Sequence, residues 1–269
     1  MPFERPTSIE AALAYLQTQE LMPTTLRTWE LGELPVEIRQ ASFFSAGVTM
    51  TELLDQALTQ VKLIAAMETD RPSARLRIKS LLRSLDYQPD PGEAGTIKDL
   101  SSSGRINLIL DTNVDQAHGF GRHQAEQNSD TLFLFPAQEL HRAGAMPREP
   151  RPWREKWVRA GGKLFEGRMI AKRNDPVWLK PLSEGGFNRF GTPYAPFDFN
   201  SGMRVRNVSR QDAIALGVIE SDEPAAAPDV QSLGQGAKSK VEIANERIRQ
   251  AIIESGLGTF DSEGRLIRL

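Results

Sequence analysis

Residues 50–86, MTELLDQALTQVKLIAAMETDRPSARLRIKSLLRSLD, carry the clearest periodic pattern in the chain. Between 50 and 68, apolar residues recur at three- and four-residue spacing, which predicts an amphipathic helix. The sequence Asp-Arg-Pro at 70–72 interrupts the pattern, which resumes in a second predicted helix at 73–86 with basic residues on its outer side. Because the connection is short, we expect an antiparallel helical hairpin.

The same pattern search predicts further elements on both sides of this hairpin. Helices are expected at 8–18, 103–128, 151–160, 211–216 and 239–255. Strands are expected at 131–140 and 168–171. Gly119 and Gly121 weaken the longest helix and predict a kink or an early end there. The expected fold is α+β, dominated by helices, with a small central sheet and a tethered C-terminal helix.

Changes in composition divide the chain into four expected parts. These are a helical N-terminal region at 1–95, an α+β region at 96–219, a linker at 220–238, and a C-terminal docking helix with a short hairpin at 239–269. The linker is acidic and contains prolines and few large apolar groups. The tail cannot bury its own apolar face, so it must dock on the main body or on another chain. We expect the remaining fold to survive its removal.

Composition excludes several classes of protein. Of the 269 residues, 39% are hydrophobic and 25% are charged, which allows a packed core, and the net charge of −2 means that nucleic acid would need a local basic patch. The absence of cysteine excludes disulfides, cysteine-ligated metals and thiol nucleophiles. No apolar run is long enough to span a membrane and the N-terminus has no signal-peptide pattern, so we expect a cytosolic type of protein without membrane contact.

No known catalytic motif is present, and we expect neither catalytic residues nor cofactors nor a metal. Asp111, Asp115 and His118 would share one face of the predicted helix at 103–128 and offer a possible metal-binding set. An ordinary polar helix face is the favoured interpretation, which makes a metal-dependent hydrolase or nuclease the least favoured function. The serines at 101–103 precede the helix, where capping accounts for at least one of them.

The segment 142–173 is strongly basic. It contains seven arginines and three lysines against three glutamates, a net charge of +7. Its candidate contact residues are Arg148, Arg151, Arg154, Lys156 and Arg159. They are suited to nucleic-acid phosphates or to an acidic protein surface, and a solvated face without a ligand remains the third alternative. Trp153 and Trp157 lie four residues apart inside the segment, and we expect them to pack in the core rather than to stack on bases.

A second distinctive stretch, TPYAPFDFNSGM at 192–203, combines prolines with aromatic residues. The residues that set it apart are Pro193, Tyr194, Pro196, Phe197 and Phe199. Prolines restrict the backbone, and aromatic side chains at this density need something to pack on. We interpret the loop as a structural staple, with a recognition loop as the alternative.

Several short motifs resemble bacteriophage head-morphogenesis proteins, the Mu F-like minor capsid family. They are GTIKDLSS at 95–102, LILDTN at 108–113, PAQEL at 136–140, PRPW at 150–153, RAGG at 159–162 and PYAPFDFNSGM at 193–203. The likeness covers about residues 35–220. The cysteine-containing signature that often ends family members is missing, which makes this chain a divergent relative.

The resemblance implies a minor head component that acts near the portal during assembly. Its expected partner is a portal or capsid protein, with DNA as a further candidate, and it would form oligomers only within the assembly. The expected location is the virion or the cytoplasm of a bacterial host. The resemblance carries over no catalytic residue, so a nucleic-acid-binding module that uses residues 142–173 is the main alternative function.

Overall fold

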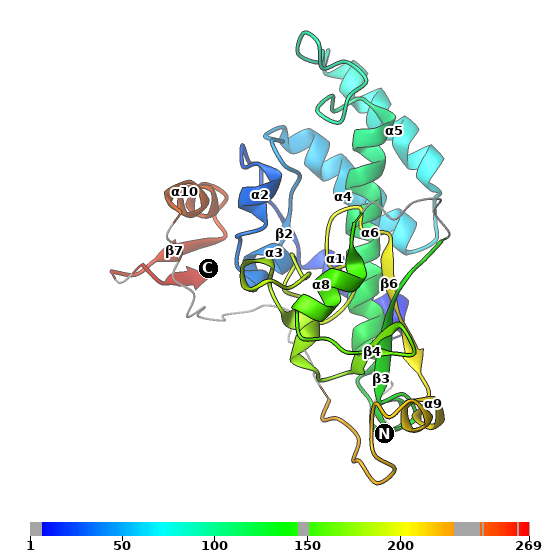
Figure 1. Ribbon diagram of the computed structural model, residues 1–269. Coiled ribbons are helices and arrows are strands. Elements are labelled where there is room, and N and C mark those ends of the chain that lie inside the picture. The colour runs from blue at the N-terminus through cyan, green and yellow to red at the C-terminus, as the bar shows by residue number, and fades with distance from the viewer. Residues whose placement is uncertain (1–6, 145–150, 229–242, 244, 263, 269) are drawn as a thin grey trace, which may run out of the picture. The chain divides into compact units, whose positions relative to one another are not determined.

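The computed structural model describes residues 7–144, 151–228, 243, 245–262 and 264–268 (Figure 1). Helices dominate this part of the chain and small sheets accompany them, so the predicted α+β class is confirmed. None of the helices described is long and apolar enough to span a membrane.

The chain forms two compact units. The helical unit contains residues 12–118 and the tail from residue 243, and the sheet unit contains residues 119–228 and the segment up to residue 11. One division falls within the long helix, between His118 and Gly119, whereas composition placed a boundary near residue 95. Residues 229–238 of the predicted linker lie outside the described residues.

The helical unit is built on the predicted hairpin. Helix α4 (Thr51–Ala65) and helix α5 (Arg71–Ser84) pack against each other. Asp70 ends the connection between them, because its carboxylate accepts a hydrogen bond of 2.7 Å from the Ser73 amide and caps α5. Buried Ala74, Ile78 and Leu82 form the inner face of α5. Both elements lie where their apolar periodicity predicts them.

Short elements complete the N-terminal part of the helical unit. They are α1 (Ser8–Gln17), which begins in the sheet unit, β1 (Glu20–Leu21), α2 (Thr28–Leu31), α3 (Val36–Ala41) and β2 (Ser42–Phe43). Strands β1 and β2 pair in parallel. Only α1 among them was predicted as an element, since the others are too short to show a period.

The C-terminal tail docks on these N-terminal elements of the same chain. It contains α10 (Glu246–Glu254), followed by the antiparallel pair of β7 (Gly258–Phe260) and β8 (Leu266–Arg268). One apolar cluster joins tail residues to N-terminal ones, namely Ile243, Ile248, Ala251, Ile252, Leu257 and Leu266 with Met22, Leu26, Leu31, Leu34 and Ile38. Arg247 also pairs with buried Glu30 at 3.0 Å. The tail supplies about half of this cluster, so its docking partner lies within the same chain, and we now expect its removal to destabilise the helical unit.

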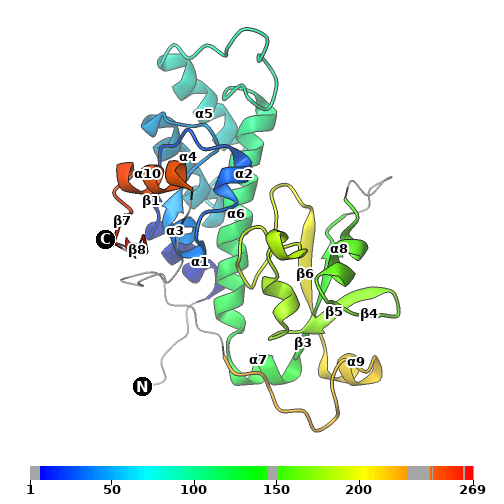
Figure 2. The same ribbon diagram turned by 60° about the vertical axis from the view of Figure 1, so that its left-hand side comes forward.

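The sheet unit is organised around four antiparallel strands in the order β4, β5, β3, β6 (Figure 2). Their bounds are Leu164–Phe165 for β4, Arg168–Lys172 for β5, Ala137–Arg142 for β3 and Met203–Val208 for β6. Helix α8 (Trp153–Arg159) shares an apolar cluster with one face of the sheet, and α9 (Arg210–Ala215) shares a second cluster with the other. Short 3-10 turns at Pro176–Leu179 and Leu182–Glu184 follow β5.

Two predicted features of this unit are wrong. Residues 131–134 belong to helix α7 (Ser129–Leu134) rather than to a strand, because the Asn128 side chain accepts a hydrogen bond of 2.8 Å from the Thr131 amide and starts a helix. The strand begins only after Pro136. Helix α6 (Ser103–Glu126) runs through Gly119 and Gly121 without a break. At Gly119 the missing side chain makes room for the carbonyl oxygen of Ala195.

Candidate interaction surface

The aromatic loop at 192–203 is built into the core of the sheet unit. Tyr194 and Phe197 are buried, and Phe197 packs against Trp178 and Phe187 with ring centroids 5.9 and 5.2 Å apart. The peptide bond between Ala195 and Pro196 is cis. Pro193, Pro196 and Phe199 are half-buried, and Phe199 meets Phe190 edge-on at 4.7 Å. The burial of Tyr194 and Phe197 is what the structural-staple interpretation of this loop requires.

Asp198 clamps the loop to two arginines. Its Oδ2 accepts a hydrogen bond of 2.9 Å from Arg151 Nη1, and its Oδ1 accepts one of 2.7 Å from Arg189 Nε. Arg151 Nη2 also donates to the Phe199 carbonyl oxygen at 2.9 Å. Arg151 was a candidate contact residue, and the structure instead gives it an internal role. The lone acid inside an aromatic loop was the available sequence signal for this clamp.

Carboxylates from elsewhere in the fold pair with three cations near the C-terminal end of the basic segment, namely Arg168, Lys172 and Arg173. Glu139 on β3 lies between Arg168 and Arg206 and accepts from both, with Nη2–Oε2 distances of 2.6 and 2.8 Å. Burial alone would raise the pKa of Glu139, but the hydrogen bonds from the two arginines outweigh burial and hold its pKa below the usual value. Lys172 pairs with Glu223 at 2.6 Å. These cations stabilise the fold and are not free to bind a ligand.

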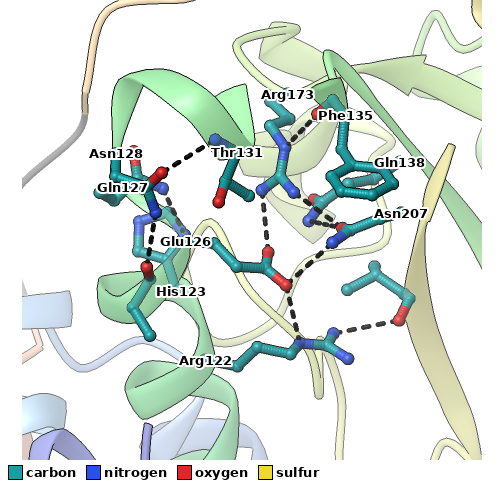
Figure 3. A network of polar contacts seen from close by, with 12 residues as sticks. Arg122, His123, Glu126, Gln127, Asn128, Thr131, Phe135, Gln138, Arg173 and Asn207 are labelled. Carbon is teal, nitrogen blue, oxygen red and sulfur yellow. Dashed lines mark hydrogen bonds and ion pairs between the residues drawn. The ribbon is translucent and has the colours of Figure 1, made fainter. Parts of the chain in front are cut away.

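Arg173 lies at the centre of a buried polar network (Figure 3). Only 6% of its side chain is exposed, and it donates to Phe135 O at 2.6 Å, to Asn207 Oδ1 at 2.7 Å and to Glu126 Oε2 at 3.0 Å. Asn207 Nδ2 closes the ring by donating to Glu126 Oε1 at 3.0 Å. Burial lowers the pKa of Arg173, opposed by Glu126. The network joins the end of α6 to the sheet, and its donors and acceptors satisfy one another.

Helix α8 presents the part of the basic segment that faces solvent. Trp153 and Trp157 are fully buried beneath it, so the prediction that they belong to the core is confirmed. Arg154 and Arg159 are exposed, and Lys156 lies over the Trp153 ring at 5.3 Å from its centroid. Among the candidate contacts, the structure thus leaves Arg154, Lys156 and Arg159 on one short helix. Arg148 lies outside the described residues.

Two exposed apolar side chains lie beside these cations. Val158 is 53% exposed on α8, and Leu164 is 40% exposed on the edge strand β4. Leu164 pairs with Met169, whose side chain belongs to the cluster under α8, so Leu164 lies on the same side of the sheet as this helix. We call Arg154, Val158, Arg159 and Leu164 the α8 surface. Sequence reasoning identified its arginines and missed its apolar members.

Asp111, Asp115 and His118, the residues considered for metal binding, all lie on α6. Asp111 forms an ion pair with Arg71, and His118 is exposed. Within the described ranges, no group of three or more His, Asp or Glu side chains has the geometry to hold a metal ion. Ser102 caps α6, because its hydroxyl accepts a hydrogen bond of 3.1 Å from the Arg105 amide.

Comparison with known proteins finds no matching family model, no matching curated protein and no matching solved structure. The interpretation of the α8 surface therefore rests on the chain's own residues.

Proposed function

We propose that this chain is a structural or assembly protein of a phage-like particle, a minor head component that acts near the portal through protein–protein contacts. The proposal draws on the family resemblance of the motifs between residues 95 and 203. The observation that supports it best is the α8 surface, where Arg154, Val158 and Arg159 are exposed on α8 and Leu164 is exposed on the same side of the sheet. Its place of action would be the virion or the cytoplasm of a bacterial host.

The composition of the α8 surface suits a protein partner. Arginine is enriched in protein interfaces, and apolar side chains at their centre supply the surface that is removed from water on binding. The two buried tryptophans hold α8 in place, so little conformational entropy is lost when a partner binds. A standard interface buries about 800 Å² on each partner. The four residues of the α8 surface would form the centre of such an interface.

Nucleic-acid binding through residues 142–173 has less support. Arg151, Arg168 and Arg173 would have to leave buried or half-buried carboxylates before they could bind phosphates. Breaking such pairs leaves uncompensated charge in the protein, which is costly.

Co-purification tests the proposed function. The chain is expressed with its neighbouring genes, particles or rings are isolated on a density gradient, and their protein content is measured by mass spectrometry. We expect the chain at low stoichiometry beside a portal-like protein. A chain that remains at the top of the gradient while particles form would contradict the proposal.

A pair of variants tests the role of the α8 surface in the same experiment. Val158→Asp introduces a charge at the centre of the surface and should reduce incorporation about tenfold or more. Leu134→Asp is the matched control, since Leu134 is 54% exposed near the end of α7, another short helix of the sheet unit. It should incorporate like the unaltered chain. Equal incorporation of both variants would exclude the α8 surface as the contact.

A further inference from the structure

Helix α5 carries a stripe of positive charge that the proposed function does not use. Its 14 residues include five cations and no acid. Four of the cations recur at every fourth residue, and we call them the α5 stripe: Arg71, Arg75, Lys79 and Arg83. Residues four apart lie on one side of a helix, about 6 Å apart along its axis, so the stripe is about 18 Å long.

The partners of the α5 stripe are mostly neutral. Arg71 forms an ion pair with Asp111 on α6. Arg75 Nη1 donates to Asn107 Oδ1 at 3.2 Å, and Lys79 Nζ donates to Ser103 Oγ at 3.0 Å. These contacts fix the direction of the two side chains and leave their charge in place. By contrast, the cations of residues 142–173 that pair with carboxylates have their charge neutralised within the fold.

Other groups around α5 do not cancel this charge. Arg83 is exposed at the C-terminal end of the helix. On the other flank of α5, Arg77 Nη1 donates to the neutral amide oxygen of Gln60 at 2.9 Å, and Asp70, which caps the helix, interacts with Arg77 electrostatically. Asp99 interacts electrostatically with Lys79, but it is buried and accepts hydrogen bonds of 2.8 Å from the Gly95 and Ser101 amides. The α5 stripe therefore keeps most of its positive charge.

The packing of α5 makes the stripe rigid. The inner face of the helix is buried, and α5 lies beside α6 (Figure 1). Side-chain contacts with α6 follow one flank of α5 from Arg71 to Lys79. Cations that are held in place before binding lose less side-chain entropy when a ligand arrives. A regular row of fixed cations suits a ligand with regularly spaced negative charges.

We propose that the α5 stripe binds the phosphate backbone of duplex DNA. The two strands of B-DNA together carry one negative charge about every 1.7 Å along the axis, so a cationic row of about 18 Å faces a dense and regular array of phosphates. No aromatic side chain lies between residues 71 and 84 to stack on bases. Binding is therefore independent of sequence, because phosphate contacts position a protein on DNA without reading bases.

This inference does not depend on the α8 surface. The stripe lies in the helical unit and the α8 surface lies in the sheet unit, so substitutions can remove either one separately. The α5 stripe also replaces the basic segment 142–173 as the nucleic-acid contact.

Fluorescence anisotropy with a labelled 20-base-pair duplex at four salt concentrations tests the proposal on the full chain. Three phosphate contacts, from Arg75, Lys79 and Arg83, predict a slope of about −2.7 in the logarithm of the binding constant against the logarithm of salt concentration. The triple variant Arg75→Gln/Lys79→Gln/Arg83→Gln should make this slope shallower by about 3, at roughly 1 for each lost contact. The matched control, Arg154→Gln/Lys156→Gln/Arg159→Gln, removes the same charge from α8 and should leave the slope unchanged.

Four results would overturn the proposal. The first three are a slope near zero for the unaltered chain, unchanged binding by the α5 triple variant, and a loss of binding confined to the α8 triple variant. Tighter binding of poly-glutamate than of the duplex at equal charge concentration would also overturn it, in favour of an acidic protein. Circular dichroism checks the fold of each variant. Should the triple variant unfold, Arg83→Gln alone serves as the test, because it changes only an exposed side chain. This variant should make the slope shallower by about 1.

Discussion

Gly119→Ala should destabilise the protein even though alanine is the better helix former. An alanine in a helix interior is favoured over glycine by about 1 kcal/mol. A Cβ at Gly119, however, would overlap the carbonyl oxygen of Ala195 and lie 3.1 Å from Tyr194 Cδ2. Tyr194 is buried and the loop that follows carries Phe197 into the core, so neither atom can retreat freely. Overpacking costs typically 1–3 kcal/mol and here involves backbone, so we expect a net loss of about 2 kcal/mol.

Gly104→Ala makes the same change in the first turn of the same helix, where no atom lies within 4 Å of the added Cβ. There the reduced entropy of the unfolded chain should raise stability by about 0.5 kcal/mol. Urea unfolding, followed by circular dichroism and tryptophan fluorescence, measures both variants. The midpoints should move in opposite directions. If both variants were stabilised, Gly119 would not be a point of close approach between helix and loop, and the account of the continuous helix would fail.

Two further predictions concern an ion pair and the tail. Glu139→Gln removes the carboxylate that joins Arg168 and Arg206 and should cost about 1 kcal/mol near pH 7. Because the folded pKa of Glu139 is lowered, its contribution is complete above its usual pKa of about 4.3 and is lost at lower pH. Thermal melts should thus show the variant and the unaltered chain converging as the pH falls below about 4.3, and a constant gap would contradict this. Truncation after residue 228 should lower the melting temperature of the helical unit and increase binding of a hydrophobic dye, because Met22, Leu26 and Ile38 lose their cover; an unchanged melt would refute the docking.

Periodicity predicted the long elements because it reports which side of a helix is buried. Helices α4 and α5 lie where their apolar stripes place them, and the tail helix docks as its apolar face requires. The pattern failed at Thr131–Leu134, where apolar residues suit a strand or a buried helix equally well. A single side-chain hydrogen bond from the preceding Asn128 decides between them. Strand β6 was missed because its alternation of Met203, Val205 and Val208 with arginines is brief and interrupted.

The candidate surface was only half predictable for a related reason. The burial of Trp153 and Trp157 follows from their four-residue spacing, and the packing of the 192–203 loop follows from its aromatic content. The exposure of Val158 and Leu164 does not follow from either pattern. It depends on how much of the helix and of the edge strand the rest of the sheet unit covers, which is set by residues distant in sequence.

Net charge along a sequence counts neighbours in the chain, whereas a ligand meets neighbours in space. The segment 142–173 has the larger local charge, yet Asp198, Glu139 and Glu126 approach from distant elements and neutralise three of its seven arginines. Helix α5 has fewer cations, and α6 contacts three of them. One of the three, Arg71, pairs with a carboxylate, whereas Arg75 and Lys79 contact a neutral amide and a neutral hydroxyl, so the charge of these two survives folding. A folded protein's affinity for phosphates depends on the charge that remains after internal pairing. On that measure the α5 stripe, and not the basic segment, is where DNA should bind.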